Sequence, residues 1–278
     1  MMADVVAAVL KVLTTIGLIL YYWLEAIFLT FVPKRLRYKD ISKETVLITG
    51  GGSGIGRLLA LRFAKLGTRV VLWDINREGC EETERQVREL GGQAYVYDCD
   101  VSDCNSINKR AAQVKQEVGS ITILVNNAGI VTGKRFLDCS EKEIVKTFEV
   151  NALSHFWMCK AFIPDMIAKN HGHLVSIASL AGLGGVVGLT DYCASKFAAV
   201  GFDETLRLEI KAEGYDGIKS TVVCPFFTNT GMFAGATPGI FGFLKPEFVA
   251  DEIMSAVLTN QEMLIIPKLF YVMYMLKS

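Results

Sequence analysis

The chain has 278 residues, of which 51% are hydrophobic, and its 29 basic and 29 acidic side chains give a formal net charge of zero. This length fits one α/β domain with an appended segment, and the charge balance excludes nucleic acid as the expected partner. The seven cysteines are odd in number and show no metal-site spacing, which favours a reducing, cytosol-facing location and no metal site.

The first segment of the chain is apolar. Residues 5–32 carry only two charges, and a run of this length can cross a bilayer or enter one leaflet. The aromatic rings at 21–23 suit a membrane interface, and the basic cluster at 34–39 favours the cytosolic side for the remainder of the chain. We therefore predict a membrane anchor with a basic flank over 1–38.

Three other interpretations of this segment stay open. One is a cleaved signal peptide, although the basic cluster follows the apolar run instead of preceding it. A second is a buried core helix. The third is an interfacial or hairpin arrangement, because Glu25 would be costly in the middle of a bilayer.

Residues 39–278 are predicted to form one domain in which strands and helices alternate. The predicted strands cover 45–49, 69–73, 94–99, 121–126, 173–178, 218–224 and 263–266. The predicted helices cover 54–66, 77–90, 103–118, 141–169, 190–213 and 246–258. This alternation predicts an α/β fold with a doubly wound, mostly parallel, seven-stranded sheet.

The first predicted strand leads into a glycine-rich turn and then a helix, which is the context of a dinucleotide-binding fingerprint. Gly50 permits a sharp turn, Gly54 lets the backbone approach a pyrophosphate, and Gly56 lets the helix pack closely on the strand. The pyrophosphate would lie on N–H groups at the helix N-terminus. The candidate cofactor contacts here are Gly50, Ser53, Gly54, Ile55 and Gly56. A glycine turn without a ligand is the alternative.

Asp74 follows the second predicted strand, about twenty residues beyond the glycines. A carboxylate there accepts hydrogen bonds from ribose hydroxyls and repels a 2′-phosphate, so we predict NAD as the cofactor. Arg77 lies three residues further on and keeps NADP open as the alternative. Asp74 also suits the N-cap of the next helix, and the two roles are compatible.

Tyr192 and Lys196 lie four residues apart in a predicted helix, which places a phenol and an ammonium on one face. A cation beside a phenol lowers the phenol pKa and makes tyrosine a usable general acid or base. Such pairs also occur by chance on solvated helices, so the neighbouring motifs decide the interpretation. Ser179 follows a predicted strand thirteen residues upstream, where the ligand crevice of an open α/β sheet forms.

Four motifs in this order resemble those of the short-chain dehydrogenase/reductase family. They are TGGGSGIG at 49–56, NNAG at 126–129, Ser179, and YCASK at 192–196. The resemblance covers about 43–267. It implies a Rossmann fold and a single NAD(P)-binding catalytic domain over 39–278.

The resemblance also implies a catalytic tetrad of Asn151, Ser179, Tyr192 and Lys196. In the family Tyr192 would transfer the proton, while Lys196 holds the nicotinamide ribose and lowers the tyrosine pKa. Ser179 would hydrogen-bond the substrate oxygen, and Asn151 would hold a water that links Lys196 to solvent. Considered without the family, Asn151 is an ordinary polar residue of a helix.

Further cofactor contacts follow from the same resemblance. Asp100 and Val101 would flank the adenine, and Asn126 and Ala128 the adenine ribose, with Gly129 leaving room for the adenosine. The carried-over contacts are Asp100, Val101, Asn126, Ala128, Gly129, Tyr192, Lys196, Pro225 and Thr230. The chain departs from the family at Phe226, where glycine is usual, so the backbone near the nicotinamide is open to question.

Aromatic and apolar residues between 226 and 246 alternate with four glycines, which predicts a mobile apolar lid. The candidate substrate contacts are Ser179, Phe227, Met232 and Phe233. We predict a lipophilic alcohol, ketone or aldehyde as substrate. A protein or membrane contact is the alternative role of this segment.

The segments 71–76, 126–134, 191–202 and 223–227, with the apolar leader, resemble a membrane- and lipid-droplet-associated branch of the family. That branch contains epidermal-type retinol dehydrogenases and 17β-hydroxysteroid dehydrogenases. The resemblance implies retinol or retinal as substrate, with a hydroxysteroid as the alternative. It also implies a homodimer, and an endoplasmic reticulum membrane or lipid droplet location facing the cytosol. A lipid-droplet coat or scaffold protein with little chemistry, and a soluble reductase, stay open as other classes.

Overall fold

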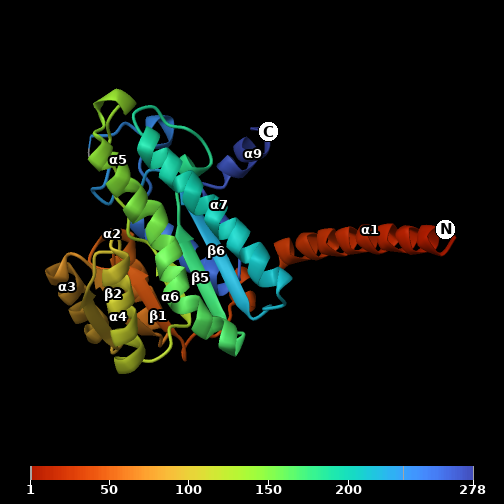
Figure 1. Cartoon of the computed structure of the whole chain (residues 1–278), viewed down its shortest axis with the longest axis horizontal. Helices are drawn as coiled ribbons and strands as arrows, with labels where there is room; N and C mark the ends of the chain where they lie inside the picture. Colours follow the sequence, from red (N-terminus) through yellow and green to blue (C-terminus); the bar gives the residue numbers. More distant parts are fainter. Residues whose placement is uncertain (1, 234, 278) are drawn as a thin grey trace. The chain divides into compact units, whose positions relative to one another are not determined.

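The computed structural model describes residues 2–233 and 235–277, and the chain divides into two compact units after Lys39. The first unit is mainly the helix α1, Met2–Phe31 (Figure 1). Its stretch Val5–Leu29 is long and apolar enough to cross a membrane, and none of that stretch is buried.

Two hydroxyl groups inside α1 are compatible with an apolar environment. The hydroxyls of Thr14 and Thr15 donate hydrogen bonds to the carbonyls of Leu10 and Lys11, at 2.8 and 2.9 Å. Hydroxyls bonded within their own helix do not require water. These two threonines therefore do not prevent α1 from lying in a membrane, as the apolar leader predicts.

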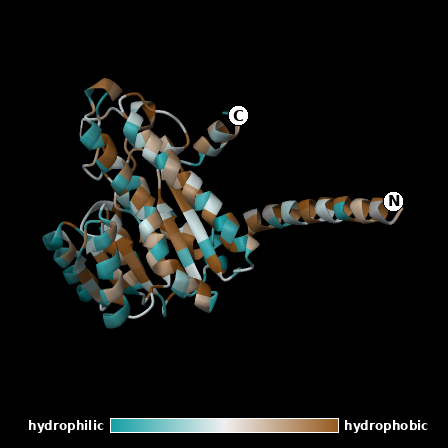
Figure 2. Ribbon diagram, in the orientation of Figure 1, coloured by the Kyte–Doolittle hydropathy of each residue, from teal (hydrophilic) through white to brown (hydrophobic). Residues whose placement is uncertain are grey.

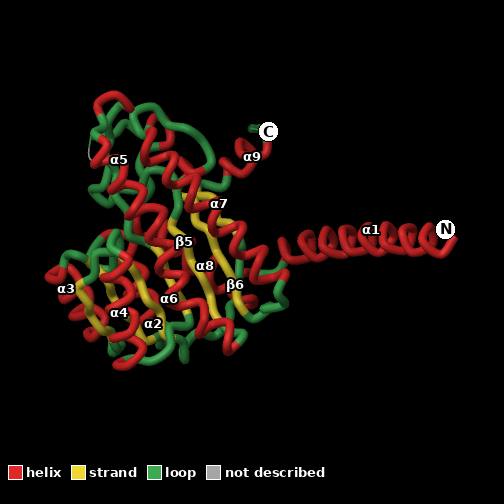
Figure 3. The backbone as a smooth tube through the Cα atoms, in the orientation of Figure 1, coloured by secondary structure: helices red, strands yellow, loops and turns green. Residues whose placement is uncertain are grey.

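The second unit contains a seven-stranded sheet in which all paired strands are parallel. Figure 3 draws its strands in yellow. The strand order is β3-β2-β1-β4-β5-β6-β7. The strands are β1 (Thr45–Thr49), β2 (Arg69–Asp74), β3 (Ala94–Asp98), β4 (Ile123–Asn126), β5 (Gly172–Ile177), β6 (Ile218–Pro225) and β7 (Met263–Ile266). The predicted doubly wound sheet is confirmed, and each predicted strand is present.

Helices cover both faces of the sheet (Figure 1). The helices of this unit are α2 (Gly54–Lys65), α3 (Arg77–Glu89), α4 (Cys104–Glu117), α5 (Glu141–Phe148), α6 (Ser154–Lys169), α7 (Thr190–Ala212), α8 (Pro246–Leu258) and α9 (Leu269–Met275). The core on one face is built from α2, α3 and α8, and the core on the other face from α4, α6 and part of α7.

The central strands are mostly apolar because both of their faces are buried. Val46 and Ile48 of β1 belong to the core beneath α2 and α8, while Leu47 between them belongs to the opposite core. Successive side chains of a strand point to opposite faces, so a buried parallel strand needs apolar residues at every position. Figure 2 shows hydrophobic strands between helices that have hydrophilic outer surfaces.

The predicted helix over 141–169 is wrong in one respect. It is interrupted after Phe148 by a π-helical turn, Glu149–Leu153, before α6 begins. Inside this turn the Asn151 side chain accepts a hydrogen bond from the Ile130 N–H (2.8 Å) and donates one to the Ile130 carbonyl (2.9 Å). Single π-helical turns within α-helices are frequent at functional sites.

Candidate active site

A cavity of about 910 Å³ lies at the carboxyl ends of the parallel strands. Its wall includes Asp74 at the end of β2, Ile177 at the end of β5 and Pro225 at the end of β6. The sheet order reverses between β1 and β4, and open α/β sheets bind ligands in the crevice at this point. The cavity therefore lies where the topology predicts a ligand.

The structure brings most of the predicted site residues to this cavity. The predicted residues that line it are Gly50, Ser53, Gly54, Ile55, Asp74, Asp100, Val101, Ala128, Gly129, Ser179, Tyr192, Lys196, Pro225, Phe227, Thr230, Met232 and Phe233. Three predicted residues, Gly56, Asn126 and Asn151, lie outside the described lining.

The glycine turn after β1 has the shape of a phosphate cradle. Gly50 and Gly54 have positive φ values of 66° and 52°, which favour glycine. A Cβ on Gly56 would lie 2.1 Å from the Gly50 carbonyl oxygen, so only glycine fits at this packing point. Ser53 is the N-cap of α2 but makes no capping side-chain bond, and the first N–H groups of a helix have no partner within it. The turn thus fits a pyrophosphate at a helix N-terminus.

Thr49 and Asn127 join β1 to the loop after β4. The Thr49 hydroxyl accepts hydrogen bonds from the N–H groups of Asn127 (2.9 Å) and Ala128 (3.0 Å), and the Asn127 amide donates to the Thr49 carbonyl (2.8 Å). Of the two asparagines of NNAG, Asn127 is the one that ties neighbouring backbones together. Asn126 instead is buried, with its Nδ2 3.8 Å from Cys159 Sγ and its Oδ1 without a partner in the described residues.

Asp74 faces the cavity from the end of β2. Its Oδ2 accepts the Gly52 N–H (2.9 Å), and its Oδ1 accepts the Asn76 N–H (3.0 Å). Asp74 is not the N-cap of α3, because Asn76 holds that position and accepts the Gly79 N–H at 3.0 Å. The carboxylate is therefore fixed beside the glycine turn.

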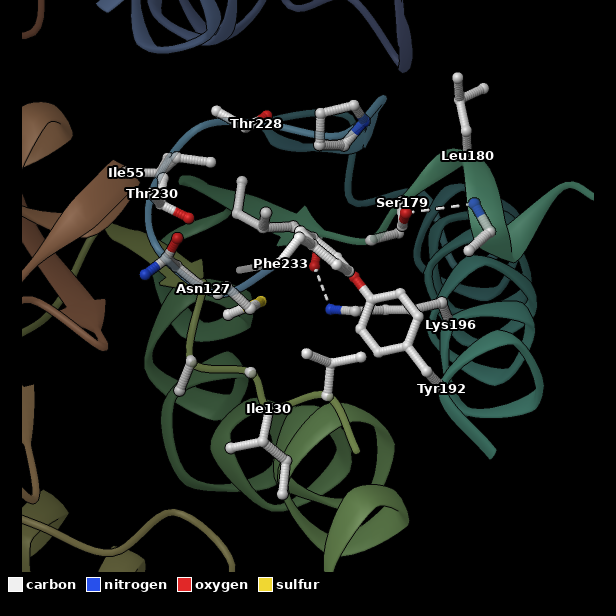
Figure 4. A pocket seen from close by; sticks show the side chains of 18 of the residues that line it. Ile55, Asn127, Ile130, Ser179, Leu180, Tyr192, Lys196, Thr228, Thr230 and Phe233 are labelled. Carbon is white, nitrogen blue, oxygen red and sulfur yellow. Dashed lines mark hydrogen bonds between the residues drawn. The ribbon is translucent and has the colours of Figure 1, made fainter. Parts of the chain in front are cut away.

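Three members of the predicted tetrad meet at the other end of the cavity (Figure 4). Tyr192 and Lys196 lie on the first turns of α7, and the lysine Nζ lies 5.7 Å from the centre of the tyrosine ring. Lys196 Nζ donates a hydrogen bond to the Ile177 carbonyl at 2.8 Å. Ser179 follows β5, and its Oγ accepts the Ala181 N–H at 3.1 Å.

Burial decides the protonation of the two titratable tetrad members. It raises the pKa of Tyr192 to about 12, against a hydrogen bond with Ser179 that lowers it. Burial also lowers the pKa of Lys196 to about 8. The pKa of Tyr192 is thus raised where the nearby lysine was expected to lower it, and the largest cause is the removal of the phenolate from water.

Asn151 lies outside the cavity lining and is bonded to two segments beside the site. Besides its bonds to Ile130, its amide donates to the Ser195 hydroxyl at 3.1 Å, and Ser195 is the neighbour of Lys196. Ile130 lines the cavity, so Asn151 links a cavity wall to α7. A uniform helical pattern over 141–169 gave no signal for this placement.

Aromatic side chains form the wall beyond the tetrad. Phe233 contacts the Tyr192 ring edge-on at 5.7 Å, and Phe227 contacts Phe233 at 4.9 Å. The ring of Phe226 stacks on Phe270 of α9 at 5.5 Å, while its N–H donates to the Ile266 carbonyl at 2.8 Å. The bulk that replaces the family's glycine therefore packs against α9.

Residues of α9 also line the cavity. They are Phe270, Met273 and Tyr274, joined by Lys277 just beyond the helix. The sequence left two roles open for the apolar run at 269–276, packing on the substrate mouth or contact with lipid, and it assigned no single residue of the run to the site.

Comparisons with known proteins agree with this geometry. The family model described as short chain dehydrogenase matches residues 44–239. The chain belongs to the short-chain dehydrogenase/reductase family. It is accordingly an NAD(P)-dependent oxidoreductase, as the cavity and the glycine turn suggest.

Two relatives of this dehydrogenase, similar to it in sequence, have names that refer to different substrates. It is 51% identical to epidermal retinol dehydrogenase 2 of Homo sapiens, over 96% of this chain and 87% of that protein. It is 44% identical to 17-beta-hydroxysteroid dehydrogenase 13 of Mus musculus, over 93% of this chain and 84% of that protein.

Two solved structures share the fold of this dehydrogenase. A short-chain dehydrogenase/reductase from Burkholderia phymatum in complex with NAD has a TM-score of 0.79 and 25% identity, covering 86% of this chain and 94% of that one. A metagenomic short-chain oxidoreductase in complex with NADP has a TM-score of 0.69 and 28% identity, covering 82% and 96%.

The buried lysine of this dehydrogenase predicts a pH-dependent stability cost. The folded pKa of Lys196 is about 8 and the ordinary lysine pKa is 10.5, so the unfolded chain binds more protons between these pH values. The cost is full below pH 8, where it is about 3 kcal/mol at 1.36 kcal/mol per pKa unit, and it fades as the pH rises to 10.5. Lys196→Met should therefore stop turnover but stabilise the fold more at neutral than at alkaline pH.

Urea unfolding of the parent and Lys196→Met at neutral pH and near the upper end of that window measures the difference. The loss of the hydrogen bond to the Ile177 carbonyl affects the variant at both pH values, so it cancels in the comparison. A stability gain that is equal at both, or larger at alkaline pH, would contradict the assigned protonation of Lys196.

Proposed function

We propose that this dehydrogenase interconverts a lipophilic alcohol and its aldehyde or ketone at a membrane, with retinol and retinal as the pair. The observation that carries the proposal is the Tyr192 phenol beside Lys196 and Ser179 in a largely apolar cavity, with a cluster of aromatic side chains next to the phenol. Relatives named epidermal retinol dehydrogenase 2 support the choice of retinol. Relatives named 17-beta-hydroxysteroid dehydrogenase 13 favour a hydroxysteroid as the second candidate.

Each residue of the site has a role in the proposed reaction. Tyr192 takes the hydroxyl proton in oxidation and returns it in reduction, and Ser179 orients the substrate oxygen by a hydrogen bond. Lys196 holds the nicotinamide ribose and a positive charge close to the phenol. NAD(P), when bound, supplies the hydride chemistry, and the aromatic wall keeps water away from it.

The proposed cofactor contacts follow the cavity from the glycine turn to the tetrad. Ser53, Gly54 and Ile55 would hold the pyrophosphate, and Asp100, Val101, Ala128 and Gly129 would hold the adenosine. Pro225 and Thr230 would hold the nicotinamide end. Gly54 lies next to Thr230, since a Cβ on Gly54 would be 3.5 Å from the threonine Cβ. The residues proposed for the pyrophosphate and for the nicotinamide are therefore close together.

We infer that Asp74 makes the enzyme prefer NAD over NADP. Its carboxylate is fixed by two backbone N–H groups and would repel a 2′-phosphate. Asp74→Asn keeps an acceptor but removes the charge, so it should improve NADPH binding relative to NADH by about tenfold, or about 1.4 kcal/mol. Competition titrations that follow NADH fluorescence measure this ratio. Tighter binding of NADPH than NADH by the parent would contradict the assignment.

The membrane location is part of the proposal. Residues 1–38 would anchor the enzyme in the endoplasmic reticulum membrane or on a lipid droplet, with residues 39–278 in the cytosol. The exposed apolar helix α1 supports the anchor. Exposed Val145 of α5 and Leu208 of α7 support a homodimer through these helices. Membrane partition of the chain with and without its apolar leader separates an anchored enzyme from a soluble reductase.

A panel of lipid alcohols tests the proposed function. The full chain in membranes is incubated with all-trans-retinol, a 17β-hydroxysteroid or a short water-soluble alcohol, each with NAD⁺ or NADP⁺. We expect NADH formation to be fastest with retinol. Faster turnover of the steroid would move the assignment to the second candidate, and no turnover of any of these alcohols would favour a coat or scaffold role.

A further inference from the structure

A buried carboxylate stands directly before Tyr192 in the chain. Asp191, in the first turn of α7, is only 5% exposed. The Thr132 hydroxyl lies 2.9 and 2.8 Å from its two oxygens, and the Thr147 hydroxyl donates to its Oδ2 at 3.0 Å. No Lys or Arg of residues 2–233 and 235–277 forms an ion pair with it. The carboxylate is instead stabilised by hydrogen bonds from two hydroxyls and by its place at the N-terminal end of the α7 dipole.

The two hydroxyl donors come from elements that build the active site. Thr132 lies in the loop after β4, two residues beyond Ile130, which lines the cavity. Thr147 lies in the last turn of α5, four residues before Asn151. Asp191 therefore joins the start of α7 to the loop after β4 and to the last turn of α5.

The first turn of α7 needs such a tether. Its N-cap, Leu189, has an apolar side chain and makes no capping hydrogen bond. The first N–H groups of a helix lack partners within the helix, so an uncapped first turn frays readily. Tyr192 is the third residue of this helix, whereas Lys196 lies a full turn deeper. Loosening of the helix start would thus move the phenol before it moves the ammonium.

We propose that Asp191 is a positioning residue for Tyr192. Its carboxylate fixes the first turn of α7 against the loop after β4 and against α5, so that the phenol oxygen stays where the proton is transferred. The proposal rests on the proposed proton transfer by Tyr192. A misplacement of about 1 Å at a reacting group can lower a rate by about 10²-fold, so a distant tether of this kind can matter for turnover.

The same helix offers a matched control. Asp203 is also buried, at 2% exposed, and also accepts two hydroxyl hydrogen bonds, from Ser176 (2.9 Å) and Ser220 (2.7 Å). It lies twelve residues after Asp191, about 18 Å further along the helix, and it is not part of the described cavity lining. Asp203→Ala therefore removes a similar buried carboxylate without loosening the first turn.

The experiment compares Asp191→Ala, Asp191→Asn and Asp203→Ala in the full chain. Turnover is measured with NAD⁺ and all-trans-retinol, and cofactor affinity with NADH fluorescence. We expect Asp191→Ala to lower kcat by about 10²-fold while the NADH Kd changes by less than about threefold. Asp191→Asn keeps an oxygen that accepts from both hydroxyls, so it should restore kcat to within about fivefold of the parent. Asp203→Ala should lower the unfolding temperature but leave kcat within about twofold.

Two results would overturn the proposal. One is a kcat of Asp191→Ala that falls no further than that of Asp203→Ala. The other is an Asp191→Asn variant as slow as Asp191→Ala. Asparagine can keep both hydrogen bonds, so a role in positioning alone should survive that change.

Hydrogen exchange separates this proposal from the proposed function. Amides at 190–196 and 128–134 should exchange faster in Asp191→Ala than in the parent or in Asp203→Ala. If the parent turns over no alcohol, the proposed function fails, and the exchange comparison still decides whether Asp191 fixes the tyrosine. Unchanged exchange at 190–196 in Asp191→Ala would refute the tether.

Discussion

Tyr192→Phe is expected to lose nearly all turnover while it binds the cofactor normally. The change removes a single oxygen, and the ring keeps its edge-on contact with Phe233. Positioned acid–base groups contribute about 10²–10⁴-fold to a rate, so we expect a loss of kcat in this range. Steady-state kinetics in both directions and an NADH titration measure the two effects. Equal rates for variant and parent would remove Tyr192 from the mechanism.

Tyr97→Phe is the matched control for this substitution. Tyr97 is also buried, and its hydroxyl donates to Glu117 at 2.7 Å, but it does not line the described active-site cavity. This variant should keep the activity of the parent. A comparable loss in both variants would indicate a general effect of removing a buried hydroxyl.

The pH dependence gives a second measurement on Tyr192. Because burial raises the pKa of Tyr192 to about 12, the phenol holds its proton at neutral pH. Reduction uses this protonated form, whereas oxidation needs the phenolate, so oxidation in the parent should accelerate as the pH rises. Tyr192→Phe should lose that acceleration. A parent whose oxidation rate is flat up to alkaline pH would contradict the assigned protonation.

Gly56→Ala is expected to disrupt the cofactor cradle. The added Cβ would lie 2.1 Å from the Gly50 carbonyl oxygen and 2.8 Å from the Asn127 amide nitrogen. Neither neighbour can withdraw, because the Asn127 amide also bonds the carbonyls of Thr49 (2.8 Å) and Gly50 (3.2 Å). Overpacking of this kind costs about 1–3 kcal/mol or more, and here it also opens the phosphate turn. We therefore expect a lower unfolding temperature and a loss of NADH affinity of at least about tenfold.

Gly201→Ala provides the control for this change. Gly201 lies within α7 and is exposed, and a Cβ there would meet nothing within 4 Å. Alanine is about 1 kcal/mol better than glycine inside a helix, so this variant should be as stable as the parent or more stable. If Gly56→Ala instead retained the unfolding temperature and NADH affinity of the parent, the close packing at Gly56 would be refuted.

The order of the elements was predictable because each rests on a local pattern. Short apolar runs became β1 to β7, since strands buried on both faces must be apolar. The glycine turn and the spacing of Tyr192 and Lys196 are equally local, because a tight turn needs Gly50 and a helix brings residues four apart together. Of the tetrad, Asn151 followed only from the resemblance to a family, because a single asparagine within a predicted helix carries no local signal.

Other features depend on partners that are distant in sequence. The π-helical turn at 149–153 coincides with the bonds of Asn151 to Ile130, which lies in another element. The tie from Asp191 to Thr132 and Thr147 spans 59 and 44 positions, and no local pattern marks it. Sequence reasoning therefore found the side chains of the site but missed much of what holds them.

The sequence by itself determined the α/β alternation, the cradle for a dinucleotide and the phenol–ammonium pair, because each depends on neighbours within one turn or one strand. Only the tertiary structure decided which asparagine of NNAG ties the strands, that α9 forms part of the cavity wall, and that the phenol pKa rises. Burial and long-range hydrogen bonds set those outcomes, and both depend on how distant segments pack together.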